Sequence, residues 1–137
     1  SKVVANVQSI YGGAVVKSTA VNQWADLLTL TVMAAEPASL RISYQSVVWK
    51  TGSSGRTILG VRIDGAANTG PTDGNSISQT GTRATTLWTT DGVALSSTWY
   101  TNITPGTHTV TLVLLSAEAG TSNAIQYGMN VEMLKQP

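Results

Sequence analysis

Apolar and polar residues alternate along most of this chain, which is the pattern of β-strands that bury one face. In the C-terminal segment Ile125–Met133 every second residue is apolar, and Gln126, Asn130 and Glu132 are among the residues between them. The same alternation runs through His108–Leu114 and Leu40–Val48. We expect further strands where the pattern is shorter or weaker, at Val3–Ser9, Ala14–Val21, Leu27–Ala34, Thr57–Ile63, Ala84–Thr89 and Leu95–Thr101.

One stretch fits two patterns. Trp24, Leu27, Leu28 and Thr31 have the spacing of one face of a helix. The segment Thr29–Val32, however, is rich in β-branched residues, whose stiff side chains favour extended backbone. We therefore expect a strand here, with at most a single helical turn before it.

Turn residues punctuate the chain at short intervals. Gly12-Gly13, Glu36-Pro37, Asp64-Gly65, Asp91-Gly92 and Pro105-Gly106 all have the composition of tight turns. Roughly eight or nine short strands separated in this way indicate an antiparallel sandwich or barrel. The chain of 137 residues has the length of a single domain, so we expect one domain over 1–137, with 1–13 as a candidate N-terminal arm.

The strand rhythm breaks between Asp64 and Arg83, where Gly, Asn, Asp, Ser and Thr accumulate. Irregular stretches of this length in small domains are usually functional loops or mobile segments. We therefore name Asn68, Asp73, Asn75 and Arg83 as candidate ligand or receptor contacts. Four oxygen-bearing side chains in this loop, beginning with Asp64, also suit calcium, but Asp-Gly pairs are ordinary turn formers, and we expect no metal site.

Composition limits the partners. Charged residues make up only 11% of the chain, well under half of the roughly 25% usual in soluble domains. Ser and Thr supply 34 residues instead, so the surface is rich in hydroxyls. The net charge is +1 without a basic stripe, which argues against nucleic acid. No apolar run is long enough to insert into a membrane, and the lack of cysteine fits assembly in a reducing cytoplasm.

Residues for catalysis are sparse. His108 is the single histidine, and it lies on the apolar side of its strand, where packing at the edge of the core is its expected role. The seven acidic residues lie mostly in turns and form no evident pair for glycoside hydrolysis. We expect no enzyme activity and no cofactor.

Several strands carry apolar residues on both faces, although a sandwich strand needs only one buried face. The second-face residues Met33, Val47, Trp49, Leu59 and Val61 therefore predict an interface with another copy of the chain. The alternative is that a barrel corner or the long loop covers them. Light scattering on purified protein separates the two.

Aromatic side chains offer a second kind of surface. Trp88, Trp99 and Tyr100 are candidates for stacking on a sugar ring. Adjacent strand residues point to opposite faces, so at most one of Trp99 and Tyr100 is free for this role. Packing in the core is the alternative for each ring.

Three segments together resemble a known family. An apolar strand, Leu28–Val32, is followed by a second that ends in Asp-Gly, Gly60–Gly65, and then by Pro-Gly-x-His-x-Val-x-Leu within Thr104–Leu112. This arrangement resembles jelly-roll domains of bacteriophage fibres and capsid-surface (decoration) proteins, which are commonly homotrimers related in shape to the C1q and tumour-necrosis-factor folds. It is also similar to carbohydrate-binding modules of the jelly-roll type. No ligand residue of either group transfers by position.

The resemblance implies an all-β, antiparallel β-sandwich of the jelly-roll type. It further implies a non-enzymatic virion structural or attachment protein: a capsid decoration protein, a head fibre or a tail-fibre tip. Such a protein would form a homo-oligomer, a trimer above other numbers, and would contact capsid or tail proteins in a virion assembled in the host cytoplasm. The alternative is a secreted or extracellular carbohydrate-binding module that recognises a surface glycan.

Overall fold

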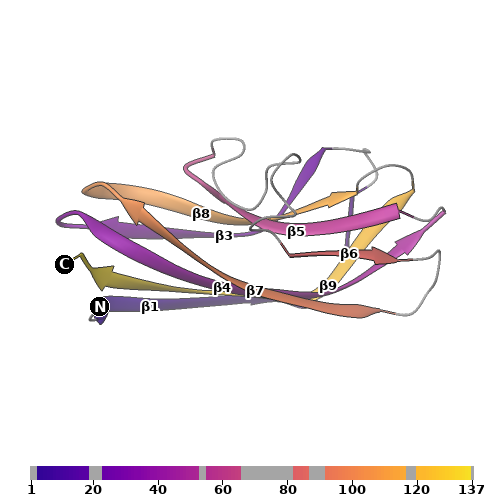
Figure 1. The fold of residues 1–137 in the computed structure, drawn as a ribbon, viewed down its shortest axis with the longest axis horizontal. Helices are drawn as coiled ribbons and strands as arrows, with labels where there is room; N and C mark the ends of the chain where they lie inside the picture. Colours follow the sequence, from indigo (N-terminus) through magenta and orange to yellow (C-terminus); the bar gives the residue numbers. More distant parts are fainter. Residues whose placement is uncertain are drawn as a thin grey trace.

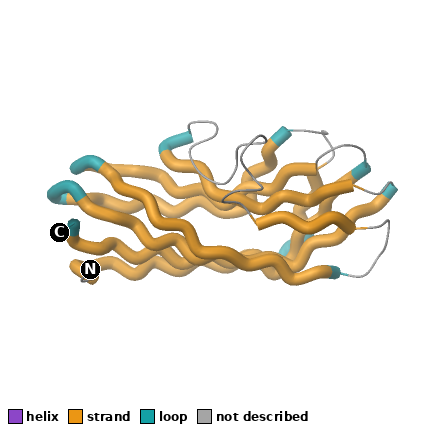
Figure 2. Tube along the Cα trace, in the orientation of Figure 1, coloured by secondary structure: helices purple, strands orange, loops and turns teal. Residues whose placement is uncertain are grey.

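A computed structural model describes residues 3–18, 23–52, 55–65, 82–86, 92–116 and 120–136 of the chain. Within these ranges every regular element is a strand, and the loops and turns between them are short (Figure 2). This part of the chain holds no helix that is long and apolar enough to cross a membrane. The strands are β1 (Val3–Gly12), β2 (Val16–Ser18), β3 (Trp24–Ala34), β4 (Ala38–Thr51), β5 (Gly55–Ile63), β6 (Thr82–Thr86), β7 (Val93–Ile103), β8 (Gly106–Ser116) and β9 (Thr121–Lys135).

The strands form two antiparallel sheets that pack face to face (Figure 1). One sheet, which we call the β9 sheet, has the order β1-β9-β4-β7, and β2 pairs with β9 beyond the end of β1. The other, the β8 sheet, has the order β3-β8-β5-β6. Apart from the pairs β1–β2 and β5–β6, each strand lies in the opposite sheet from the one before it, which is the double Greek key of a jelly roll. The predicted fold class is confirmed.

The N-terminal segment belongs to the sandwich. β1 pairs with β9 from Val3, opposite Leu134, to Gly12, opposite Tyr127. The expected N-terminal arm is therefore corrected for residues 3–12, because a strand paired in this way along its length is a member of the sheet. The pairing also brings the two ends of the described chain side by side at one end of the molecule (Figure 1).

The core lies between the two sheets. Leu40, Ile42 and Val48 of β4 are completely buried there, as are Leu112 and Leu114 of β8. Each such side chain contributes about 1.5–3 kcal/mol to folding by leaving water. The residues between them on β4 point to the other side of the β9 sheet. The alternation predicted from the sequence therefore determines which side chains of β4 face the core and which face outward.

One end of the core is polar. Lys50 and Ser122 lie opposite each other on β4 and β9, and neither has exposed surface. The hydroxyl oxygens of Ser122 and Thr57 are 2.7 Å apart, so a hydrogen bond joins β9 of one sheet to β5 of the other. The hydroxyl of Ser116 donates to the carbonyl oxygen of Gly120 at 2.9 Å. These bonds satisfy buried polar groups and hold the two sheets together at this end.

Where β5 pairs with β8, the β8 sheet is buried on both faces within the chain, and this corrects part of the predicted interface. Leu59 and Val61 were expected to face a second copy, but both are completely buried in the core between the sheets. On the opposite face, Ile58 and Leu115 are 1% and 5% exposed and pack with Trp24. The expectation was wrong for these two positions because Leu59 and Val61 are on the core-facing side of β5, opposite Leu114 and Leu112 of β8.

A β-bulge accounts for the helical spacing in β3. The register against β8 shifts between Asp26 and Leu28, so Leu27 is an extra residue in the strand. Leu27 and Leu28 consequently both pack against the core, although they are neighbours in sequence. The extra residue breaks the period of two and imitates the spacing of a helix.

Candidate functional site

The side of the β9 sheet that faces away from the core is a broad polar surface. Because Leu40 and Ile42 point inward, Arg41, Ser43 and Gln45 point outward. Residues directly opposite them on the neighbouring strands share that side of the sheet. We call this surface the outer face; it comprises Ser9 and Tyr11 of β1, Gly128, Asn130 and Glu132 of β9, Arg41, Ser43 and Gln45 of β4, and Ser96, Thr98 and Tyr100 of β7.

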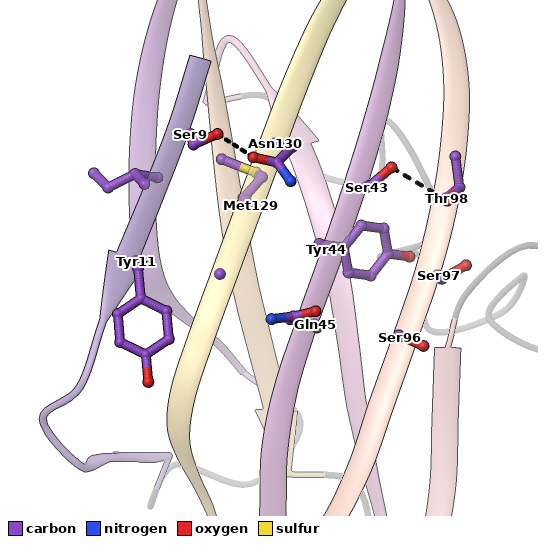
Figure 3. Close-up of a pocket in the computed structure, with 12 residues that line it drawn as sticks. Ser9, Tyr11, Ser43, Tyr44, Gln45, Ser96, Ser97, Thr98, Met129 and Asn130 are labelled. Atoms are coloured by element: carbon purple, nitrogen blue, oxygen red, sulfur yellow. Dashed lines mark hydrogen bonds between the residues drawn. The ribbon is translucent and has the colours of Figure 1, made fainter. Parts of the chain in front are cut away.

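A groove of about 420 Å³ crosses the outer face from β1 to β7 (Figure 3). None of its lining residues is charged, and its polar groups are hydroxyls and carboxamides. Ser9 donates a hydrogen bond to Oδ1 of Asn130, and the hydroxyl oxygens of Ser43 and Thr98 are 3.3 Å apart. Among the described residues, neither Nδ2 of Asn130 nor the amide of Gln45 has a hydrogen-bond partner. Both side chains therefore have donors left for a ligand.

Gly128 forms the floor of the groove between Tyr11 and Gln45. The three residues lie in one row across β1, β9 and β4. A Cβ atom at Gly128 would lie 3.6 Å from the ring of Tyr11 and 3.6 Å from the amide nitrogen of Gln45. The glycine thus leaves a trough between two side chains, and Tyr11 remains 61% exposed.

A second hollow of about 360 Å³ lies farther along the outer face, where Arg41, Tyr100 and Asn102 contribute to its lining. Nε of Arg41 donates to Oε1 of Glu132 at 2.7 Å, so the two charges neutralise each other. Hydrogen bonds to Glu132 and then to Tyr100 raise the pKa of Arg41. Ser39 donates to Oδ1 of Asn102 at 2.7 Å, which repeats the Ser9–Asn130 arrangement of the groove.

His108 forms an ion pair at the edge of the core. Nδ1 lies 2.7 Å from Oδ2 of Asp64, and Nε2 lies 2.7 Å from the carbonyl oxygen of Thr104. The carbonyl oxygen of Thr104 and the carboxylate of Asp64 both accept, so the protonated ring, in which both nitrogens donate, satisfies both contacts. The bond to Asp64, followed by the bond to Thr104, raises the pKa of His108.

Asp64 is held in place from two sides. Its partial burial opposes ionisation, but hydrogen bonds from His108 and from the backbone N–H of Thr109 keep the pKa of its carboxyl below the usual value. The Thr109 bond is 2.9 Å long. Asp64 has a φ of 57°, a left-handed conformation that Asp tolerates better than most residues. The pair joins the end of β5 to the start of β8, and because both ring nitrogens are engaged, we assign His108 a structural role.

The structure separates the two adjacent aromatic candidates. Trp99, opposite Ile42, packs against the core. Tyr100, opposite Arg41, is 58% exposed on the outer face. Strand alternation predicted that at most one of these rings is free, and Tyr100 is the free one.

The other predicted interface residues lie on two sides of the sandwich. Met33 is 66% exposed, opposite Thr107 on the outer side of the β8 sheet. Val47 and Trp49 are partly buried on the outer side of the β9 sheet. These residues do not form one patch, and their role as an interface stays a prediction.

Most of the candidate loop between Asp64 and Arg83 lies outside the residues that the structure describes. Asn68, Asp73, Asn75 and Trp88 lie outside the described residues, and Arg83 is placed only by its backbone, in β6 opposite Ile58. In the described ranges no three His, Asp or Glu side chains gather in a way that could hold a metal ion.

Sequence reasoning missed the residues of the groove. Tyr11 lies outside the strand expected at Val3–Ser9, and Gln45 and Asn130 are polar positions within alternating strands. The signal in the sequence is the set of uncharged amides and hydroxyls at the outward-pointing positions of several strands. It becomes a site only through the register that aligns those strands.

Comparisons with known proteins point to the fold. No family model and no curated protein matches the sequence. The fold is similar to part of a chain in a solved structure of infectious bursal disease virus, Gx strain, with a TM-score of 0.51 and 16% sequence identity. The match covers 93% of this chain and 32% of the viral chain, so this chain spans about a third of that length. At this identity the likeness concerns the jelly-roll architecture alone.

Proposed function

We propose that this chain is a non-enzymatic structural or attachment domain of a virus particle. The observation that carries the proposal is the match of 93% of the chain to part of a chain in the infectious bursal disease virus structure. The composition agrees with it. The chain has 34 Ser and Thr residues and only 11% charged residues, so its surface presents hydroxyls rather than ions to the solvent. In this proposal the chain resides in the virion, as a capsid decoration protein, a head fibre or a tail-fibre tip, and contacts capsid or tail proteins.

The proposed assembly is a homotrimer. Met33 lies on the outer side of one sheet, and Val47 and Trp49 lie on the outer side of the other. Two different surfaces of one chain meet in head-to-tail contacts, which close into a ring when the rotation between neighbours is right. Each buried Met, Val or Trp side chain adds about 1.5–3 kcal/mol to such a contact.

Particle fractionation tests the proposal. Antibodies raised against the purified chain are applied to gradient fractions of particles from the organism that encodes it, and to the same particles on electron-microscope grids. We expect the chain to co-sediment with intact particles and the label to lie on them. Antibodies preincubated with an excess of the purified chain control for unspecific label.

The opposite distribution would contradict the proposal. If the chain were present only in the soluble fractions, with unlabelled particles, a role in the virion would be wrong. The alternative reading of the fold, a carbohydrate-binding module outside any particle, predicts that soluble distribution.

A further inference from the structure

We infer that the outer face of the β9 sheet binds a neutral oligosaccharide. This inference names a class of ligand and goes beyond the proposed role in a virus particle. The ligand and the role in the particle do not depend on each other. It combines three features of the face: an uncharged groove, two exposed tyrosine rings and donors left free on carboxamides.

The polar groups of the groove match hydroxyl groups. A carboxamide offers two donors and an acceptor, and a Ser or Thr hydroxyl both donates and accepts. Sugar hydroxyls also donate and accept, so each can be satisfied by such neighbours. Cross-strand bonds already fix Asn130 against Ser9 and Asn102 against Ser39. The side chains are therefore oriented before a ligand arrives, which lowers the entropy lost on binding.

The exposed rings supply apolar contact. Tyr11 is 61% and Tyr100 58% exposed, and both are among the few large apolar side chains that the described surface leaves in water. A tyrosine combines an apolar ring face with a polar tip. The C–H face of a sugar ring covers such a face while its hydroxyls reach the neighbouring amides. Gly128 keeps the space beside Tyr11 open for that ring.

The spacing of the rings indicates a chain of sugars rather than one. Tyr11 is on β1 and Tyr100 on β7, at opposite edges of the sheet. Three strand spacings separate them, about 14 Å, and four residues along the strand direction add about 13 Å. A further hollow of about 370 Å³ shares Tyr11 and Gln45 with the groove and extends it past the row of Gln45.

The charges of the face disfavour an anionic ligand. Arg41 is the one cation among the outer-face residues, and Glu132 already neutralises it. The groove itself has no charged lining. A phosphate, a sulfated sugar or a sialylated sugar would lose water there without gaining a free positive charge.

A glycan array tests the inference. The chain is coupled to fluorescent streptavidin, so that several copies bind together and weak affinities register. The array carries neutral oligosaccharides of hexose, N-acetylhexosamine and deoxyhexose units beside sialylated and sulfated ones. We expect binding to neutral oligosaccharides longer than one unit. No binding at all, or binding only to acidic glycans, would overturn the inference.

Variants then place the site. Tyr11→Ala and Tyr100→Ala should each weaken binding of the neutral glycan found on the array by about tenfold or more, as calorimetry measures it. Gly128→Leu fills the trough and should abolish binding. Thr31→Leu, an exposed position on the outer side of the other sheet, should leave it unchanged. Circular dichroism checks that each variant folds. If Gly128→Leu does not fold, the two Tyr variants decide the outcome. Unchanged binding in both Tyr variants would place the ligand elsewhere and overturn the assignment.

Discussion

At the scale of single residues, the Asp64–His108 pair makes the stability of the fold depend on pH. The pKa of His108 is raised above 6.5, so its contribution is complete below pH 6.5 and is lost as the pH rises through the higher value of the folded state. The pKa of Asp64 is lowered from 3.8, so its contribution is complete above pH 3.8 and is lost as the pH falls through the lower value of the folded state. The pair therefore stabilises the fold most between pH 3.8 and pH 6.5.

Urea unfolding at about pH 5.5 and about pH 9 measures this effect. We expect the pair to contribute less than about 1 kcal/mol more at the lower pH, because the side chain of Asp64 is 46% exposed and solvent screens the pair. His108→Gln removes the titrating group, and Asp64→Asn removes its partner while it keeps a residue that tolerates the left-handed backbone. Both variants should flatten the pH dependence. A slope equal to that of the unmodified chain would contradict the role of the pair.

The residue scale also shows where the sequence is informative. Alternation placed Tyr100 and Trp99 on opposite sides of β7, and it put His108 at the edge of the core. It could not show that Leu59 faces the core, because apolar residues lie on both faces of β5 and the pairing with β8 decides which of them point inward. Nor could it show that Asp64 holds His108, because 44 residues separate the two.

At the scale of elements, the pairing of the edge strand β1 with β9 depends on a small residue. A Cβ atom at Gly12 would lie 2.2 Å from Cε1 of Tyr127, and Tyr127 is only 5% exposed. The ring cannot swing into solvent without leaving the core. Gly12→Ala should therefore destabilise the fold by about 1–3 kcal/mol.

Gly128→Ala is the matched control, since Gly128 lies in the same strand pair and its added methyl meets only ordinary contacts at 3.6 Å. We expect a change within about 1 kcal/mol for this variant. Thermal or urea unfolding of both proteins measures the difference. Equal stability of the two variants would show that β1 shifts freely over Tyr127.

Most elements follow from the pattern of the sequence, and the exceptions have local causes. The alternating run Ile125–Met133 lies within β9 as predicted. β3 was ambiguous because one inserted residue, Leu27, breaks its alternation. β9 contains a similar irregularity, where Gln126 has a φ of 53° and the register against β4 shifts between Gln45 and Val47. A bulge depends on the partner strand, so a single strand's pattern does not predict it.

At the scale of the whole molecule, the sandwich was predictable and the groove was not. Turn density and alternation determine the class of fold, since each strand needs one buried face. The outer face needs more: β1, β9, β4 and β7 come from distant parts of the chain, and only their register brings Tyr11 beside Gly128 and Gln45. The long loop drew attention in the sequence because it is polar, whereas the groove is made of strand residues with no compositional bias.

The assembly prediction also belongs to this scale. The exposed residue Met33 lies on the opposite side of the sandwich from Val47 and Trp49. A two-fold dimer would join a surface to itself, whereas a ring joins two different surfaces. Head-to-tail contacts close into a ring only when the rotation between neighbours is right, and otherwise they form an open filament. We propose that they close here as a trimer.

Light scattering coupled to size exclusion tests the trimer. At about 10 μM chain we expect a mass three times the 14.3 kDa of one chain, with a share of monomer that grows on dilution. Met33→Glu puts a charge into the proposed contact, where its desolvation opposes association, so this variant should be monomeric with an unchanged circular dichroism spectrum. Lys135→Glu, at the exposed end of β9, should leave the mass unchanged. A monomer or a dimer for the unmodified chain would contradict the trimer.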